Sequence, residues 1–181
     1  IGLVKRMDRS FFMLGYFQNG ISEYKTSNLF LGYSRQLFKN LSIGTRGNYY
    51  QLSIQEYGKS NLLSVDLGLF SKVSKALSIS AYYDAIASSK FNETFKKDNR
   101  IVVAFIYNPS MKVKLITEFE KNEQSDLSPK LGVSYSPNAK IQFNCGVDLG
   151  REMVGFGFRY SLNSIHLAAA QTIHTQLGNI F

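Results

Sequence analysis

The side chains best suited to chemistry in this sequence are two histidines, one cysteine and several carboxylates. His166 and His174 occur eight residues apart in a run that alternates like a strand, so roughly 27 Å would separate them at about 3.4 Å per residue, too far to share a metal ion. Cys145 is the single cysteine, which excludes an internal disulfide and a cysteine-based zinc cluster. We therefore expect no metal and no cofactor, and we interpret Cys145 as a small apolar filler.

Two carboxylates stand close enough in sequence to suggest acid–base chemistry or a cation site. Glu118 and Glu120 occupy alternate positions of one run and would share a strand face. The competing interpretation, which we favour, is a solvated face on which mixed charges pair with one another. No Ser-His-Asp, Cys-His or glycine-rich phosphate motif occurs in a suitable context, because the isolated glycines lie inside strand-like runs. The sequence does not predict an enzyme.

The elements that would position these side chains are strands, because apolar and polar residues alternate along most of the chain. The run 61–74 is the clearest, with Leu63, Val65, Leu67 and Leu69 opposite Ser64, Asp66, Gly68 and Lys72. The next run places Tyr83 and Ala85 on the apolar face, opposite Asp84. The runs 113–123 and 141–150 repeat the pattern. One face of each strand is apolar and the other is polar.

The expected strands are longer than those of ordinary soluble sheets. They span 1–7, 11–19, 27–38, 41–55, 61–74, 77–89, 99–110, 113–123, 127–137, 141–150, 153–162 and 165–177. Most therefore have about 9 to 14 residues, which suits a tilted membrane-crossing strand. The mean hydropathy of −0.13 does not conflict with this, because alternating strands average near zero even when one face contacts lipid.

The connections between these runs alternate in length. Short turns are expected at 8–10, 39–40, 75–76, 109–112 and 137–140, and longer polar links at 19–26, 56–60, 88–98 and 122–126. Outer-membrane barrels have short periplasmic turns and longer extracellular loops, so the pattern predicts an all-β, antiparallel up-and-down transmembrane β-barrel. The segment from Ser88 to Arg100 would be the longest extracellular loop. Its basic residues, Lys90, Lys96, Lys97 and Arg100, would face lipopolysaccharide phosphates or a partner.

Charged residues on the polar faces are expected to line the lumen of this barrel. They are Arg46, Asp66, Lys72, Asp84, Lys114, Glu118, Glu120, Lys130 and Asp148. The formal net charge of +8 is spread over turns and strand faces, and no nucleic-acid-binding motif is present, so we expect no nucleic-acid partner.

The number of strands suggests an incomplete barrel. If the short turns are periplasmic, the first of the twelve strands begins on the extracellular side and the last one ends there. One further strand at each end would bring both termini to the periplasm and give about fourteen. We therefore expect residues 1–181 to form one transmembrane β-barrel domain that is incomplete at both ends.

Several short motifs from about Ile101 onward resemble the C-terminal half of FadL-like outer-membrane proteins, including the PorV-type barrels of Bacteroidetes. They are Tyr107–Ser110, Leu131–Asn138, Gly155–Tyr160 and Ile173–Gly178, the last with Thr175 where the family usually has proline. The resemblance implies an outer-membrane location. It also implies either passage of small, hydrophobic molecules or docking in a secretion or surface complex, with outer-membrane lipid, lipopolysaccharide and other outer-membrane or secretion proteins as partners.

Two other functions remain open from sequence. A soluble lipid-binding β-barrel would line its cavity with the apolar residues, but such barrels use about eight strands rather than twelve. A closed outer-membrane barrel with a purely structural role is the other alternative.

Overall fold

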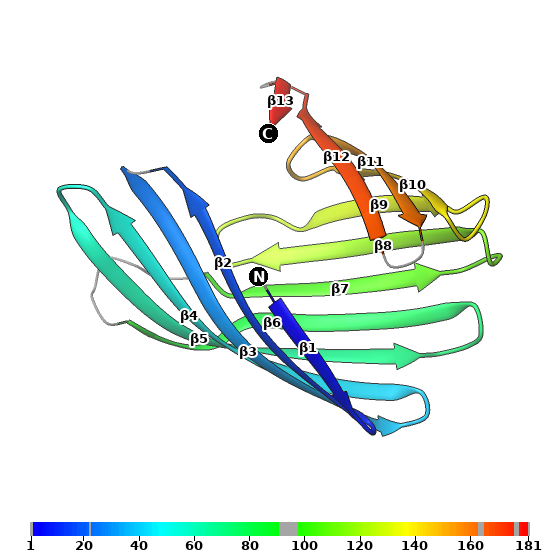
Figure 1. The fold of residues 1–181 in the computed structure, drawn as a ribbon, viewed down its shortest axis with the longest axis horizontal. Coiled ribbons are helices and arrows are strands. Elements are labelled where there is room, and N and C mark those ends of the chain that lie inside the picture. The colour runs from blue at the N-terminus through cyan, green and yellow to red at the C-terminus, as the bar shows by residue number, and fades with distance from the viewer. Residues whose placement is uncertain (1, 22, 91–97, 163–164, 176–177, 181) are drawn as a thin grey trace. The chain divides into compact units, whose positions relative to one another are not determined.

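The computed structural model describes residues 2–21, 23–90, 98–162, 165–175 and 178–180, and these residues form only strands and their connections. The strands are β1 (Gly2–Met7), β2 (Ser10–Gly20), β3 (Tyr24–Phe38), β4 (Leu41–Ile54), β5 (Gly58–Lys72), β6 (Leu77–Lys90), β7 (Arg100–Tyr107), β8 (Val113–Asn122), β9 (Ser128–Tyr135), β10 (Ile141–Asp148), β11 (Met153–Leu162), β12 (Ile165–His174) and β13 (Gly178–Ile180). Hydrogen-bonded neighbours follow chain order from β1 to β13 (Figure 1). The expected all-β, antiparallel up-and-down fold is confirmed.

The chain divides into two compact units. Unit 1 comprises Ile1–Ser71 and Ala81–Ile101, and unit 2 comprises Lys72–Ser80 and Val102–Phe181. Each unit is described separately below. No helix in the described part of the chain is long and apolar enough to cross a membrane.

Two of the expected long links are shorter in the structure, because the strands continue into them. β2 and β3 remain paired up to Gly20 and Lys25, and β4 and β5 up to Ile54 and Gly58. Polar side chains led to the loop interpretation, but a backbone ladder needs only its own N–H and C=O groups. The turn at 55–57 is tight, with Glu56 at φ 71° and Gly58 at φ 88°. The predicted alternation of loop lengths is therefore weaker than expected.

The last expected strand, 165–177, also differs from the structure. β12 ends at His174, and the chain turns back to pair Ile173 with Asn179 in β13. Gly178 adopts a φ of 79°, a left-handed conformation that glycine adopts readily and most other residues do not. The described residues therefore contain a thirteenth, short strand beyond the twelve expected.

In both units the apolar face of the strands is exposed and the polar face is more buried, which is the reverse of the pattern in soluble proteins. On β5, Leu63, Val65 and Leu67 are 43%, 40% and 39% exposed, whereas Ser64 and Asp66 are 3% and 5% exposed. The same pattern occurs in unit 2. There the apolar Leu115 and Phe119 of β8 and Phe143 of β10 are exposed and Glu120 is buried. The polar face is therefore covered by its own side chains, and the apolar face is open.

One assignment on β6 is wrong. Ala85 was expected on the apolar face opposite Asp84, but both residues are buried, at 1% and 3% exposure. The physical reason is a local irregularity, because Ala85 has a φ of 58° and interrupts the two-residue alternation of the strand. Two consecutive residues therefore lie on the buried side.

Candidate functional site

The polar face of unit 1 carries a cluster of two arginines and two aspartates, here called the arginine–aspartate cluster: Arg46, Asp66, Asp84 and Arg100. Strand register explains its central pair, because β4 and β5 form a hairpin in which Arg46 lies opposite Asp66. Arg46 donates to Asp66 Oδ2 from Nε at 2.9 Å and from Nη2 at 2.8 Å. Its Nη2 also lies 3.8 Å from Asp84 Oδ1, and Arg100 pairs with Asp84 Oδ2. The four charges thus form one chain of ion pairs.

The carboxylate of Asp66 is fully occupied by donors. Besides the two bonds from Arg46, its Oδ2 accepts Asn48 Nδ2 at 2.8 Å. Its Oδ1 accepts the backbone N–H of Ala85 at 2.9 Å, which the left-handed conformation of Ala85 directs toward it. A buried carboxylate stays ionised at low cost only when its oxygens are satisfied in this way.

Aromatic rings support both guanidinium groups. Arg46 lies over the ring of Phe30 at 5.8 Å from its centroid, and Arg100 lies over Tyr82 at 5.6 Å. The Phe30 ring in turn covers Gly15, where an added Cβ would come 2.2 Å from the ring. Gly15 therefore leaves the space that Phe30 fills. This packing holds Arg46 in one orientation, because a guanidinium stacks favourably on an aromatic face.

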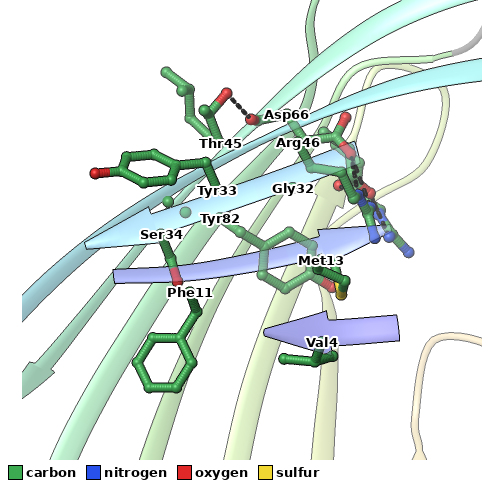
Figure 2. Close-up of a pocket in the computed structure, with 15 residues that line it drawn as sticks. Val4, Phe11, Met13, Gly32, Tyr33, Ser34, Thr45, Arg46, Asp66 and Tyr82 are labelled. Carbon is green, nitrogen blue, oxygen red and sulfur yellow. Dashed lines mark hydrogen bonds and ion pairs between the residues drawn. The ribbon is translucent and has the colours of Figure 1, made fainter. Parts of the chain in front are cut away.

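A hollow of about 530 Å³ lies beside this cluster on the same face of unit 1. Its walls include Val4 of β1 and Phe11 and Met13 of β2 (Figure 2). Glycines on β3, β4 and β5 leave its floor open, at Gly32, Gly44 and Gly68. The volume is within the range of small-molecule sites, and so is the combination of apolar walls with a few polar groups.

Unit 2 carries a second group, here called the lysine–carboxylate cluster: Glu118, Glu120, Lys130, Asp148 and Arg151. Lys130 Nζ lies 3.0 Å from Glu118 Oε1 and 3.9 Å from Asp148 Oδ2, and it also pairs with Glu120. Arg151 Nη2 donates to Glu120 Oε1 at 2.8 Å. Register again explains the arrangement, because Lys130 pairs with Glu118 on β8 and with Asp148 on β10.

The end of β10 fixes Asp148 within this second cluster. Asp148 Oδ1 accepts the Ser128 hydroxyl at 2.8 Å and the backbone N–H groups of Gly150 and Arg151 at 3.1 and 3.0 Å. A Cβ at Gly150 would come 2.3 Å from Ser128 Oγ, so only glycine fits there without displacing the serine. These contacts join β9 and β10 to the turn at 149–152.

Seven of the nine side chains predicted to line a lumen lie in these two clusters. The other two, Lys72 and Lys114, are exposed. Of the expected loop residues, Lys96 and Lys97 lie outside the described residues, and Lys90 is the last residue of β6. Arg100 differs from the expectation, because it begins β7 and pairs with Asp84 instead of standing in a loop.

Sequence reasoning missed three contributors: Asn48, Ala85 and Arg151. Asn48 could have been found, because it follows Arg46 on the same face and lies opposite Ser64. Arg151 stands in the turn 149–152, where side-chain direction does not follow from alternation. Ala85 could not have been found, because its role comes from a backbone conformation and not from its side chain.

The arrangement offers ion pairing and apolar contact to a molecule on the polar face. No group of three or more His, Cys, Asp or Glu residues that could hold a metal ion occurs in the described segments. The carboxylates of both clusters each pair with arginine or lysine. The charged side chains can instead orient a molecule held against the polar face.

Solved structures with a similar fold include hydrocarbon transporters. The Pseudomonas putida toluene transporter TodX matches with a TM-score of 0.76 at 10% identity, over 96% of this chain and 76% of that one. The chain has the fold of an outer-membrane β-barrel. The CymD monoaromatic hydrocarbon channel matches with a TM-score of 0.71 at 13% identity over 97% and 77%. A Pseudomonas aeruginosa FadL homologue matches with a TM-score of 0.70 at 11% identity over 94% and 68%.

These similarities support the FadL-like part of the expected resemblance at the level of fold. No protein-family model matches the chain. No curated protein matches it either. The structural neighbours are named as channels and transporters, not as enzymes. The PorV-type resemblance and a role in secretion remain predictions.

Proposed function

We propose that this protein is part of the wall of an outer-membrane channel that passes small hydrophobic molecules. The observation that carries the proposal is the reversed burial of its strands, with leucines exposed on one face and aspartates buried on the other. Exposed leucines at alternate positions along several strands would drive aggregation in water, but they match a lipid environment. The polar face would then line the lumen.

The hollow of unit 1 supports a hydrophobic substrate over a purely polar one. Val4, Phe11 and Met13 give it apolar walls beside the arginine–aspartate cluster. Apolar walls do not help ions or sugars to pass. They favour the binding of a hydrocarbon, because contact between the two removes apolar surface from water. TodX and CymD, whose names record toluene and monoaromatic hydrocarbons, suggest the size of the molecule.

The docking role in a secretion or surface complex has no comparable support. On β5 the exposed Leu63, Val65 and Leu67 alternate with polar residues on the other face, as a lipid-facing wall requires. A soluble lipid-binding barrel is disfavoured for the same reason, because it would bury its apolar face.

Uptake measurements test this function directly. The full chain is expressed in the outer membrane of a host that lacks such a channel, and the entry of radiolabelled toluene into intact cells is followed. We expect faster toluene entry than in cells with the empty vector, with glucose entry unchanged as a control for leakage. Equal toluene entry in both strains would overturn the proposal.

A further inference from the structure

The guanidinium of Arg46 presents an unused pair of N–H donors beside the hollow of unit 1. Its hydrogen bonds to described residues come from Nε and Nη2. Nη1 makes no such bond in the described part of the chain, and the side chain is 38% exposed. Because Phe30 and Asp66 fix the guanidinium from two sides, Nη1 is held ready for an acceptor at little entropic cost.

The carboxylates of the two aspartates in the cluster are not accessible to a ligand. Asp66 and Asp84 side chains are 7% and 4% exposed, and Asp66 already receives four hydrogen bonds. A cationic ligand would therefore meet guanidinium groups and find no accessible carboxylate. The charged groups accessible on this side of the hollow are therefore the guanidinium donors and not the carboxylates.

The charge of the cluster argues against an anionic ligand as well. Its two arginines are matched by two aspartates, so the four side chains sum to zero charge. A carboxylate placed against Arg46 would lose part of its hydration and would lie close to Asp66 and Asp84, whose like charges repel it. A neutral acceptor gains a charge-assisted hydrogen bond without that cost.

We propose that the hollow of unit 1 selects neutral apolar molecules that carry one hydrogen-bond acceptor, such as an aromatic ketone, with Arg46 Nη1 as the donor. The apolar body would contact Val4, Phe11 and Met13, and the acceptor would face the arginine. This inference rests on the proposed function, because it assumes that the polar face contacts a hydrophobic substrate. It adds a preference within that substrate class.

Three probes of similar size separate the possibilities. Ethylbenzene has no acceptor, acetophenone has a neutral carbonyl, and benzoate carries a charge. Their binding to the purified full chain in detergent micelles is measured by equilibrium dialysis, with protein-free micelles as the blank. We expect acetophenone to bind about tenfold or more tightly than ethylbenzene, as a hydrogen bond to a charged donor implies, and benzoate to bind less tightly than acetophenone.

Two variants assign the preference to the site. Arg46→Gln should remove the preference of acetophenone over ethylbenzene. Gly68→Val should weaken both neutral probes by filling the floor, where the nearest atom to an added Cβ is Tyr82 Cβ at 4.0 Å. Gly47→Val is the matched control on the opposite face of the adjacent strand, since no atom lies within 4 Å of its Cβ position. It should leave all three affinities unchanged.

Different failures have different meanings. Equal binding of acetophenone and ethylbenzene, or tightest binding of benzoate, would overturn the selectivity while leaving hydrocarbon passage intact. If Gly68→Val does not weaken binding of the neutral probes, the hollow of unit 1 is not their binding site. This test does not depend on whether Arg46→Gln folds. Toluene uptake by cells is the separate readout for the proposed function, so loss of the one does not imply loss of the other.

Discussion

Asp66 is the residue on which the polar face of unit 1 depends most. It joins β4, β5 and β6 through Arg46, Asn48 and the backbone of Ala85. Each of these donors would lose its hydrogen bond to Asp66 if the carboxylate were lost. Removing one partner of a buried ion pair lowers the free energy of unfolding by much more than the intact pair contributes to it. The reason is that the other charge stays buried without a partner.

The change Asp66→Asn should therefore lower the free energy of unfolding by about 2–4 kcal/mol. The amide would present an NH2 group to donors that now meet a carboxylate oxygen. Glu118→Gln is the matched control, because Glu118 has a side chain 26% exposed and one ion pair, and its loss should cost less than about 1 kcal/mol. Urea unfolding in lipid vesicles measures both. Equal effects would show that burial of the carboxylate does not decide its contribution.

Ala85 holds its N–H toward Asp66 only because its backbone is left-handed. Ala85→Val should destabilise the protein by about 1–3 kcal/mol, since a β-branched side chain is poorly tolerated at a φ of 58°. Ala81→Val on the same strand is the control and should change stability little. If both variants unfold at the same urea concentration, the left-handed conformation is not needed.

At the scale of the strand, the packing of one glycine against one ring links three neighbouring elements. Gly15 of β2 lies beneath Phe30 of β3, and Phe30 supports Arg46 of β4. The interaction is cross-strand, because Gly15 pairs with Phe30 in the register. Glycine inside a strand usually weakens it, but here the aromatic ring covers the exposed backbone.

Gly15→Ala should displace the Phe30 ring and destabilise the protein by about 1–3 kcal/mol. A second change, Phe30→Leu, should remove part of the conflict, so the double variant should be less destabilised than the sum of the two single variants. Thermal unfolding of the four proteins gives the coupling. Additive effects would mean that the ring and the glycine are not in contact.

The apolar face of the same strands should not tolerate a charged side chain. Leu67→Arg, in the middle of β5, should cost about 2–4 kcal/mol in a bilayer, because the residue is exposed on the apolar face and its new charge would enter lipid. Lys114→Arg keeps a charge at an exposed position of the polar face and should be neutral. Unfolding of Leu67→Arg at the same urea concentration as the parent would contradict a lipid-facing wall.

At the scale of the whole molecule, the two faces should divide lipid from water. Cys145 is a natural probe for this division, because it is exposed and lies two residues after Phe143 on the same apolar face of β10. A bimane attached to Cys145 in vesicles should be quenched by brominated lipid and not by iodide in the buffer. Asn144→Cys combined with Cys145→Ser places the label on the opposite face and should reverse the result. Iodide quenching at Cys145 would invert the assignment of the faces.

The fold class and the two faces follow from the sequence alone, because the side-chain period of a strand is fixed by backbone geometry. Alternation was enough to assign Asp66 to the polar face and Leu67 to the apolar face. Even the pairing of Arg46 with Asp66 follows once the turn at 55–57 is located, since a tight hairpin fixes the register of both strands.

What only the tertiary structure decided lies where the backbone departs from that period. Ala85 is buried because of its left-handed conformation. The ion pair between Arg100 of β7 and Asp84 of β6 depends on how the two strands are placed, which alternation along either strand does not give. The hollow beside Arg46 depends on glycines of three neighbouring strands: Gly44 lies opposite Gly68, and Gly32 lies opposite Arg46. The pattern of a single strand does not show that these glycines lie together. Polar residues also extend β2, β3 and the start of β5 beyond their expected bounds, because main-chain hydrogen bonds do not depend on the polarity of the side chains.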